Sequence, residues 1–311
     1  MTKALPALLA LLAAIGAAAP VFAHADHPPA PHDLWTTWTF DPWALVPMAL
    51  TAAAYACGVH RMWRRAGLGC GIRIWQAASF AAGYVFLLVA LVSPLDGLGE
   101  ALFSAHMAQH VVLMTLAAPL IILGLPLPAM LLGLPPSWRH RLLVLGRSAP
   151  WRSAWSFLGL PFVAAFLQLA VLWSWHAPAL FQATLASDLV HGVMHASMLG
   201  AALLFWWAAL PLGRRRRPAF LSAAFSIAVT LKLSGLLGAL LSFAGTPLYP
   251  AYEGHSEAWG LTLLEDQQLA GLIMWVSGGP IYIVACIALM ALWFRTLEAR
   301  PSTSLSGIPA P

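Results

Sequence analysis

The chain has 311 residues, of which 60% are hydrophobic and only 9% are charged. A soluble domain usually carries about 25% charged residues, so this composition indicates an integral membrane protein. The formal net charge of +5 does not indicate nucleic-acid binding, because the basic residues stand in short segments between apolar runs, where membrane topology explains them. The three cysteines show no C-x-x-C spacing and predict neither a disulfide framework nor a cysteine-based metal site.

Residues 1–23 have the pattern of a secretory signal peptide. Lys3 provides the positive start, a short apolar core follows, and Val-Phe-Ala at 21–23 gives a small-residue cleavage pattern. An uncleaved first span is the alternative, but the segment is short and Pro20 breaks it. We therefore expect cleavage before His24 and a His- and Pro-rich periplasmic tail over 24–42, which either binds metal or is simply solvated.

Seven apolar segments have the length of a membrane span. They predict an all-α fold, a polytopic membrane helix bundle over 43–297, followed by a cytoplasmic tail over 298–311. The apolar segment 125–136 is too short to cross and is broken by prolines, so we expect it at the inner interface. The predicted spans are 43–60, 74–93, 101–124, 155–175, 189–211, 219–243 and 268–294.

The arginines occupy alternate connections of this scheme, at 61–73, 139–152, 214–217 and 295–300. The positive-inside rule therefore predicts a multi-pass protein of a bacterial inner membrane with a periplasmic mature N-terminus. Lys232 is the exception, because it falls in the middle of the sixth span. A charge at that depth is expected to face the bundle interior and to find a partner there.

Five histidines fall in the outer part of this bundle. His106 and His110 form one pair four residues apart, His191 and His195 form a second, and His176 ends the fourth span. Residues four apart lie on one helix face, about 6 Å along the axis. Imidazole is a good ligand for copper, iron, zinc and nickel. The sequence therefore predicts one metal site made by these five residues, with hydrogen bonding between helices as the alternative.

Other residues near this level have two interpretations each. Met114 and Met198 continue the two histidine faces; thioethers suit Cu(I), but core packing explains them more simply. Asp266 opens the seventh span either as a helix N-cap or as an acceptor for a histidine. The aromatic loop 244–266 is expected to anchor at lipid headgroups rather than to act as a lid. No nucleophile triad, phosphate loop or H-E-x-x-H motif occurs, so we do not expect an enzyme.

Four motifs in this order resemble the multi-spanning CtaG family of cytochrome c oxidase assembly factors. The resemblance implies a role in building a haem–copper oxidase, with delivery of copper, expected as Cu(I), to its active centre. An oxidase subunit and a periplasmic copper donor are then the expected partners. The matching segments are His106–His110 with Ala118-Pro119 and Leu123–Pro126, Trp175–Pro178 with Leu180-Phe181, His191–His195 with Leu204–Trp207, and Asp266–Gly271 with Met274-Trp275.

A haem-binding membrane electron-transfer protein is the alternative function, because histidine pairs on neighbouring helices are also suited to haem. Electron transfer across the membrane through two haems would require histidine ligands at both membrane levels. The inner level of this sequence has no such pair. The sequence therefore favours a copper-handling assembly factor.

Overall fold

The computed structural model describes residues 29–210 and 220–298. Within these ranges the chain is helical and contains no strand, and six helices are long and apolar enough to span a membrane. A bent pair of helices makes a seventh span if it is counted as one. The prediction of an all-α polytopic bundle is confirmed. The predicted signal peptide over 1–23, residues 24–28 of the predicted tail, the Arg214–Arg217 run and residues 299–311 lie outside the described residues.

The spans follow the predicted order closely. The fourth is the bent pair, α9 (Ala149–Leu158) and α10 (Pro161–Trp175), which meet at 73° because Gly159 ends the first helix and Pro161 begins the second. The third span, Phe103–Leu123, consists of α5 (Phe103–Val111), a π-helical segment η2 (Val112–Ala117) and α6 (Ala118–Leu123). The others are α2 (Pro42–Ala66), α3 (Ile74–Leu91), α12 (Asp188–Ala209), α13 (Phe220–Ser242) and the pair α14 (Leu263–Ser277) with α15 (Gly279–Glu298).

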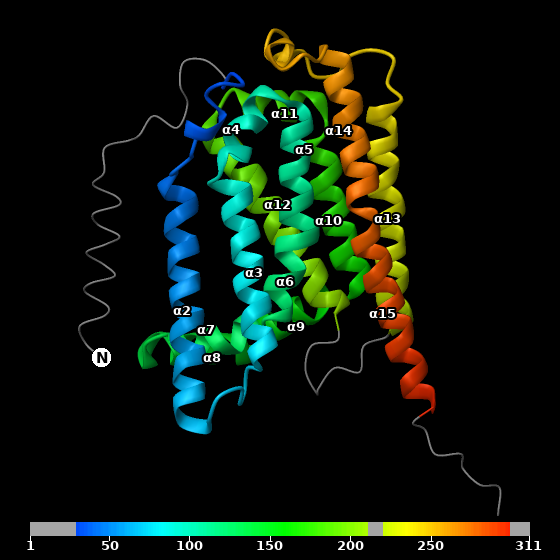
Figure 1. Cartoon of the computed structure of the whole chain (residues 1–311). Coiled ribbons are helices and arrows are strands. Elements are labelled where there is room, and N and C mark those ends of the chain that lie inside the picture. The colour runs from blue at the N-terminus through cyan, green and yellow to red at the C-terminus, as the bar shows by residue number, and fades with distance from the viewer. Residues whose placement is uncertain (1–28, 211–219, 299–311) are drawn as a thin grey trace, which may run out of the picture.

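The third span is the centre of the bundle (Figure 1). In its apolar window 67% of the residues are buried, against 22–39% in the other single-helix spans. Side chains of this span take part in all three hydrophobic clusters of the core, through Met114, Leu113 and Met107 respectively. A site on α5 is therefore largely enclosed by the neighbouring helices.

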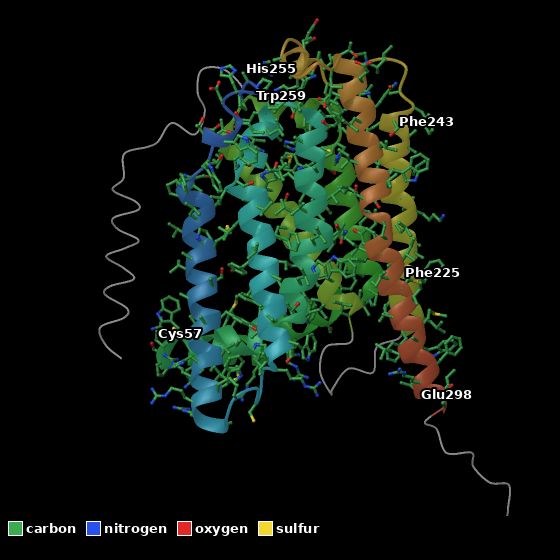
Figure 2. The ribbon with its side chains drawn as sticks, viewed as in Figure 1. Cys57, Phe225, Phe243, His255, Trp259 and Glu298 are labelled. Atoms are coloured by element: carbon green, nitrogen blue, oxygen red, sulfur yellow. The ribbon has the colours of Figure 1, made fainter. Side chains whose placement is uncertain are left out.

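Short helices close the two ends of the bundle (Figure 1). One end carries α7 (Pro126–Gly133), α8 (Pro136–Arg147) and α9, and we call it the arginine end. The other carries η1 (Leu34–Thr36), α4 (Pro94–Ala101), α11 (Pro178–Leu185) and a loop over 243–262 with η3 (Pro250–Tyr252) and η4 (Ser256–Trp259). We call this the histidine end. Figure 2 shows His255 and Trp259 at the histidine end and Glu298 at the arginine end.

The two predictions about unusual segments have different outcomes. The proline-rich segment 125–136 runs across the arginine end rather than through the bundle, as expected from its length (Figure 1). Lys232 is exposed on α13, so the prediction that it faces the bundle interior is wrong. The interior positions of this helix are taken by small and apolar residues such as Ala224, Ile227 and Gly238, which pack against the neighbouring spans.

Candidate metal centre

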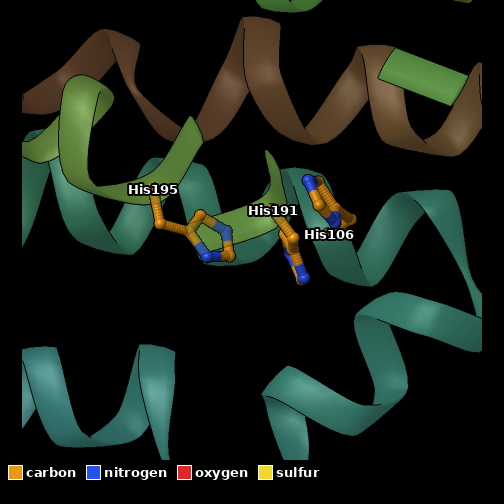
Figure 3. Close-up of side chains that lie close together, drawn as sticks. All are labelled: His106, His191 and His195. Atoms are coloured by element: carbon orange, nitrogen blue, oxygen red, sulfur yellow. The ribbon is translucent and has the colours of Figure 1, made fainter. Parts of the chain in front are cut away.

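Three imidazoles from two helices meet at the histidine end. His106 projects from α5, and His191 and His195 project from α12 on the same side (Figure 3). The nitrogen atoms that these three residues can offer as ligands all lie within 4.8 Å of one another. The ring centroid of His106 is 5.5 Å from that of His191 and 5.7 Å from that of His195. Nitrogens about 2.0–2.1 Å from one metal ion lie closer together than the 4.8 Å limit, so the three rings would turn slightly towards an ion that they share.

The other two predicted ligands lie beside this set of three. The ring centroid of His110 is 4.4 Å from that of His106 and 5.4 Å from that of His195. His176, the C-cap of α10, has its centroid 5.8 Å from His110. The structure thus brings all five predicted residues into one cluster, but His110 and His176 do not belong to the set whose ligand nitrogens all lie within 4.8 Å of one another.

Burial without hydrogen bonding distinguishes the α5 pair. His106 is 0% exposed and His110 is 4% exposed, and among the described residues neither ring nitrogen of either residue has a hydrogen-bond partner. A neutral imidazole has one N–H donor and one acceptor nitrogen, and leaving them unpaired in the interior is unfavourable. The alternative of hydrogen bonding between helices therefore does not account for this pair. A cluster of neutral imidazole donors fits a first-row metal ion such as copper or zinc.

Asp266 holds the N-terminus of the helix that carries this pair. Its carboxylate is fully buried and accepts hydrogen bonds from the backbone N–H groups of Phe103, at 2.7 Å, and Ser104, at 3.1 Å. The first N–H groups of a helix have no partner within the helix, and a negative charge there is favourable. Asp266 thus caps α5 from across the bundle and sets the height of His106.

This role differs from both interpretations of Asp266 made from the sequence. Its own helix, α14, is capped by Thr262, whose hydroxyl accepts from the N–H of Glu265 in a capping box. The carboxylate bonds that the structure shows are to backbone N–H groups of α5 and not to a histidine. Sequence analysis missed this cap because no local pattern relates residues 163 positions apart.

An aromatic cover separates the histidines from the end of the bundle. Tyr249 and Tyr252 of the 243–262 loop are 2% and 0% exposed. Tyr249 donates to the carbonyl of His176 at 2.7 Å, and Tyr252 donates to the carbonyl of Gly99 at 2.8 Å. Phe181 of α11 lies beneath them, with its ring centroid 5.1 Å from that of His106. The prediction that the loop aromatics anchor at headgroups is wrong for these two tyrosines.

Two further observations show how firmly this cover is seated. Burial raises the pKa of the Tyr252 hydroxyl well above its usual range, so the group remains a donor at any physiological pH. The side-chain carbonyl of Gln267, at the start of α14, accepts from the backbone N–H of Leu248 at 2.6 Å. The loop is therefore fixed to the same helix that supplies Asp266.

Residues 53–296 match the model of the cytochrome c oxidase caa3 assembly factor family, Caa3_CtaG. This match covers most of the chain, so the protein belongs to that family of polytopic membrane proteins. It is 26% identical to uncharacterised proteins of Mycobacterium bovis and Mycobacterium tuberculosis, over 86% of this chain and 41% of each relative. A Mycobacterium leprae protein is also 26% identical, over 84% of this chain and 40% of its own length. The chain thus spans about two fifths of these relatives, and no solved structure matches it.

Proposed function

We propose that the protein is a cytochrome c oxidase assembly factor that binds copper as cargo at the histidine cluster and passes it to a haem–copper oxidase. The observation that carries this proposal is the set of His106, His191 and His195, whose ligand nitrogens lie within 4.8 Å of one another; His106 and His195 are buried and His191 is partly exposed. The protein that would receive the copper is inferred from the family, whose members are described as cytochrome c oxidase assembly factors. A periplasmic donor would load the site, and no chemical conversion of a substrate is required.

Copper in the Cu(I) state suits this site best among the metals that imidazole binds. The surroundings are apolar and aromatic, with Phe181 and Tyr249 packed at the cluster. No carboxylate belongs to the closest set in the described part of the chain. A set of neutral donors in a low-dielectric site favours a monovalent ion over a divalent one, because less charge has to be buried without compensation.

The packing argues against haem as the ligand. A haem held by two histidines needs a slot for its macrocycle between the two rings. Here the rings of His106, His110 and His195 are spaced by 4.4–5.7 Å and pack against one another. The absorption spectrum of the purified protein tests this directly, since a Soret band would overturn the copper proposal.

We place the histidine end at the periplasmic face of the inner membrane. Support comes from the described arginines, which gather at the other end in the last turns of α2, α8 and α15 and in α9. An Asp33→Cys variant in cells with a permeabilised outer membrane should react with an impermeant maleimide. The native Cys70, exposed near the arginine end, is the internal control and should react only after lysis. The reverse pattern would overturn the orientation.

Metal analysis tests the copper site itself. The full chain, purified without chelator under reducing conditions, should retain copper, and His106→Ala should lose at least tenfold in Cu(I) affinity against a competing chelator. His60→Ala is the matched control, because His60 is exposed on α2 far from the cluster and should bind like the unaltered protein. Equal affinities in both variants, or a preference for zinc over Cu(I), would overturn the proposal.

A further inference from the structure

A cavity next to the three-imidazole set is lined by soft donor atoms. It lies between α5, α10, α13 and the junction of α14 with α15, and extends from the histidine cluster towards the middle of the bundle. Most of its remaining lining is apolar, including Leu172, Leu231 and Trp275. Five of its fourteen lining residues offer a thioether or an imidazole: Met107, His110, Met114, His176 and Met274.

His176 directs an unprotonated ring nitrogen towards the thioether of Met107. Its Nδ1 lies 2.7 Å from the carbonyl oxygen of Leu172, which can only accept, so Nδ1 carries the proton. In the neutral ring Nε2 is then a lone pair, and it lies 3.1 Å from Sδ of Met107. A thioether has no proton to donate either. Two buried electron-pair donors therefore face each other, an arrangement that a soft cation would stabilise by accepting both pairs.

His110 belongs to both sets of donors. Met107 and His110, spaced i and i+3, share the face of α5 that lines the cavity, and Met114 lines it from the following segment η2. His110 is also 4.4 Å from His106 by ring centroids, on the side of the three imidazoles. The ring of His110 thus lies between the three imidazoles of His106, His191 and His195 and the donors His176 and Met107.

We propose that the cluster holds two copper positions in series, which deepens the proposed function and rests on it. The first is formed by His106, His191 and His195. The second is formed by His176, Met107 and His110, whose neutral ring offers one free nitrogen and so ligates one ion at a time, with Met274 and Met114 further along the cavity. The second position lies beside the first, because Met107 follows His106 on α5 and His176 ends α10 at the histidine end. The cavity continues from it along Met114 and Met274.

Titration of the purified full chain with Cu(I) tests this arrangement. We expect two equivalents per chain and an X-ray absorption spectrum with both nitrogen and sulfur neighbours. Met107→Leu, which conserves volume, should lose the second equivalent and the sulfur neighbours but keep the first. Met198→Leu is the matched control, because Met198 is equally buried on α12 but does not line the cavity.

The outcomes separate the two proposals. One equivalent with nitrogen neighbours only, unchanged in Met107→Leu, would overturn the second position and leave the proposed function standing. Retention of no copper by the unaltered protein would overturn both. If Met107→Leu does not accumulate in the membrane, His176→Gln serves as the second variant and should also lose the sulfur-containing equivalent.

A separate observation concerns the outward face of α13. Lys232 is exposed there, twelve residues from Phe220 and ten residues before Ser242, so both ends of the helix are about 15 Å or more away. Phe225, Leu236 and Phe243 are 59%, 48% and 78% exposed on the same face. Figure 2 shows Phe225 and Phe243 projecting from this side. A lysine among apolar side chains at mid-span depth is too deep to reach either headgroup layer, and such residues normally pair with an acid.

We infer that this face binds a transmembrane helix of the client oxidase that carries an aspartate or glutamate at mid-depth. A second copy of this chain would not serve, because the acidic residues of the spans stand at their ends, as Asp188, Glu265 and Asp266 do. A symmetric contact through α13 would also bring two lysines together. The inference shares the oxidase client with the proposed function but does not depend on copper.

Photocrosslinking tests the contact in membranes that contain the oxidase. A photoreactive residue at position 236 should form an adduct with an oxidase subunit, reduced at least fivefold by Lys232→Met and preserved by Lys232→Arg. The same probe at Phe166 of α10, which is 69% exposed, is the control and should give no adduct. An adduct with a second copy, or one insensitive to Lys232→Met, would overturn the inference. Because His106→Ala should keep the adduct, loss of copper binding and loss of docking are distinguishable.

Discussion

The two ends of the bundle are built by different means. At the arginine end, α7 lies against α2 so closely that a Cβ on Gly58 would stand 1.8 Å from the carbonyl oxygen of Ala129, and one on Gly133 would stand 1.8 Å from that of Ala54. At the histidine end, α13 and α14 also approach closely, since a Cβ on Gly271 would stand 2.5 Å from the carbonyl oxygen of Gly238, but this end in addition buries polar groups such as His106, Asp266 and Tyr252. The comparison teaches that close helix packing alone accounts for the arginine end, while the histidine end also contains buried polar groups that packing does not require.

The largest effect should come from breaking the tight end. Gly133→Val would drive a side chain into the backbone of α2, and neither helix backbone can yield as a flexible side chain would. Overpacking typically costs about 1–3 kcal/mol or more. We expect little or no protein in the membrane, measured by immunoblot.

Gly192→Ala is the matched control for this prediction. Gly192 lies beside His191 on α12, yet a Cβ there would meet nothing within 4 Å. This variant should accumulate normally and gain up to about 1 kcal/mol from helix propensity. Equal abundance of the two variants would contradict the contrast drawn between the ends.

The next largest effect should separate function from stability at the histidine end. His110→Ala and His195→Ala should lower oxidase activity in cells several-fold at limiting copper, without lowering the amount of this protein. The reason is that these rings are proposed to hold metal, while the apolar spans hold the fold. Excess copper should restore activity, because mass action compensates for weaker binding.

The measurement pairs membrane abundance with oxidase activity at both copper levels. Abundant variant protein with unaltered oxidase activity at limiting copper would contradict copper delivery. Loss of the variant protein from the membrane would show that the histidines are needed for the stability of the fold, as the glycines of the arginine end are expected to be.

Removal of the long-range cap should produce an intermediate effect on both stability and binding. Asp266→Ala leaves the N–H groups of Phe103 and Ser104 without their acceptor, a change that typically costs about 1–3 kcal/mol for buried groups. We expect a lower melting temperature and weaker copper binding, since His106 lies one turn further along α5. Glu257→Ala, an exposed acid of the loop, should change neither value; an identical effect of the two would contradict specific capping.

The smallest effect should come from loosening the aromatic cover. Tyr252→Phe removes one hydrogen bond to the carbonyl of Gly99, typically worth about 0.5–1.5 kcal/mol. Hydrogen exchange in residues 243–262 should become faster, and bound copper should pass to a chelator more quickly at unchanged affinity. If release is as slow as before, the cover does not control access to the cluster.

The sequence alone determined the spans and the placement of the five clustered histidines at the end opposite to the described arginines. These properties follow from local patterns, because hydropathy reports on a continuous segment and a spacing of four residues defines one helix face. Residues that are close in sequence are then close in space whatever the rest of the bundle does, so His106 with His110 and His191 with His195 could be paired in advance.

Only the tertiary structure decided which of these residues meet. Helical periodicity defines a face but not its direction relative to other helices. It could not predict that His106, His191 and His195 form the closest set, or that Lys232 points away from the bundle interior. The cap of α5 by Asp266 and the covering tyrosines depend on contacts between residues up to 163 positions apart. The bend of 73° between α9 and α10 was not predicted either, although Gly159 and Pro161 mark the end of one helix and the start of the next.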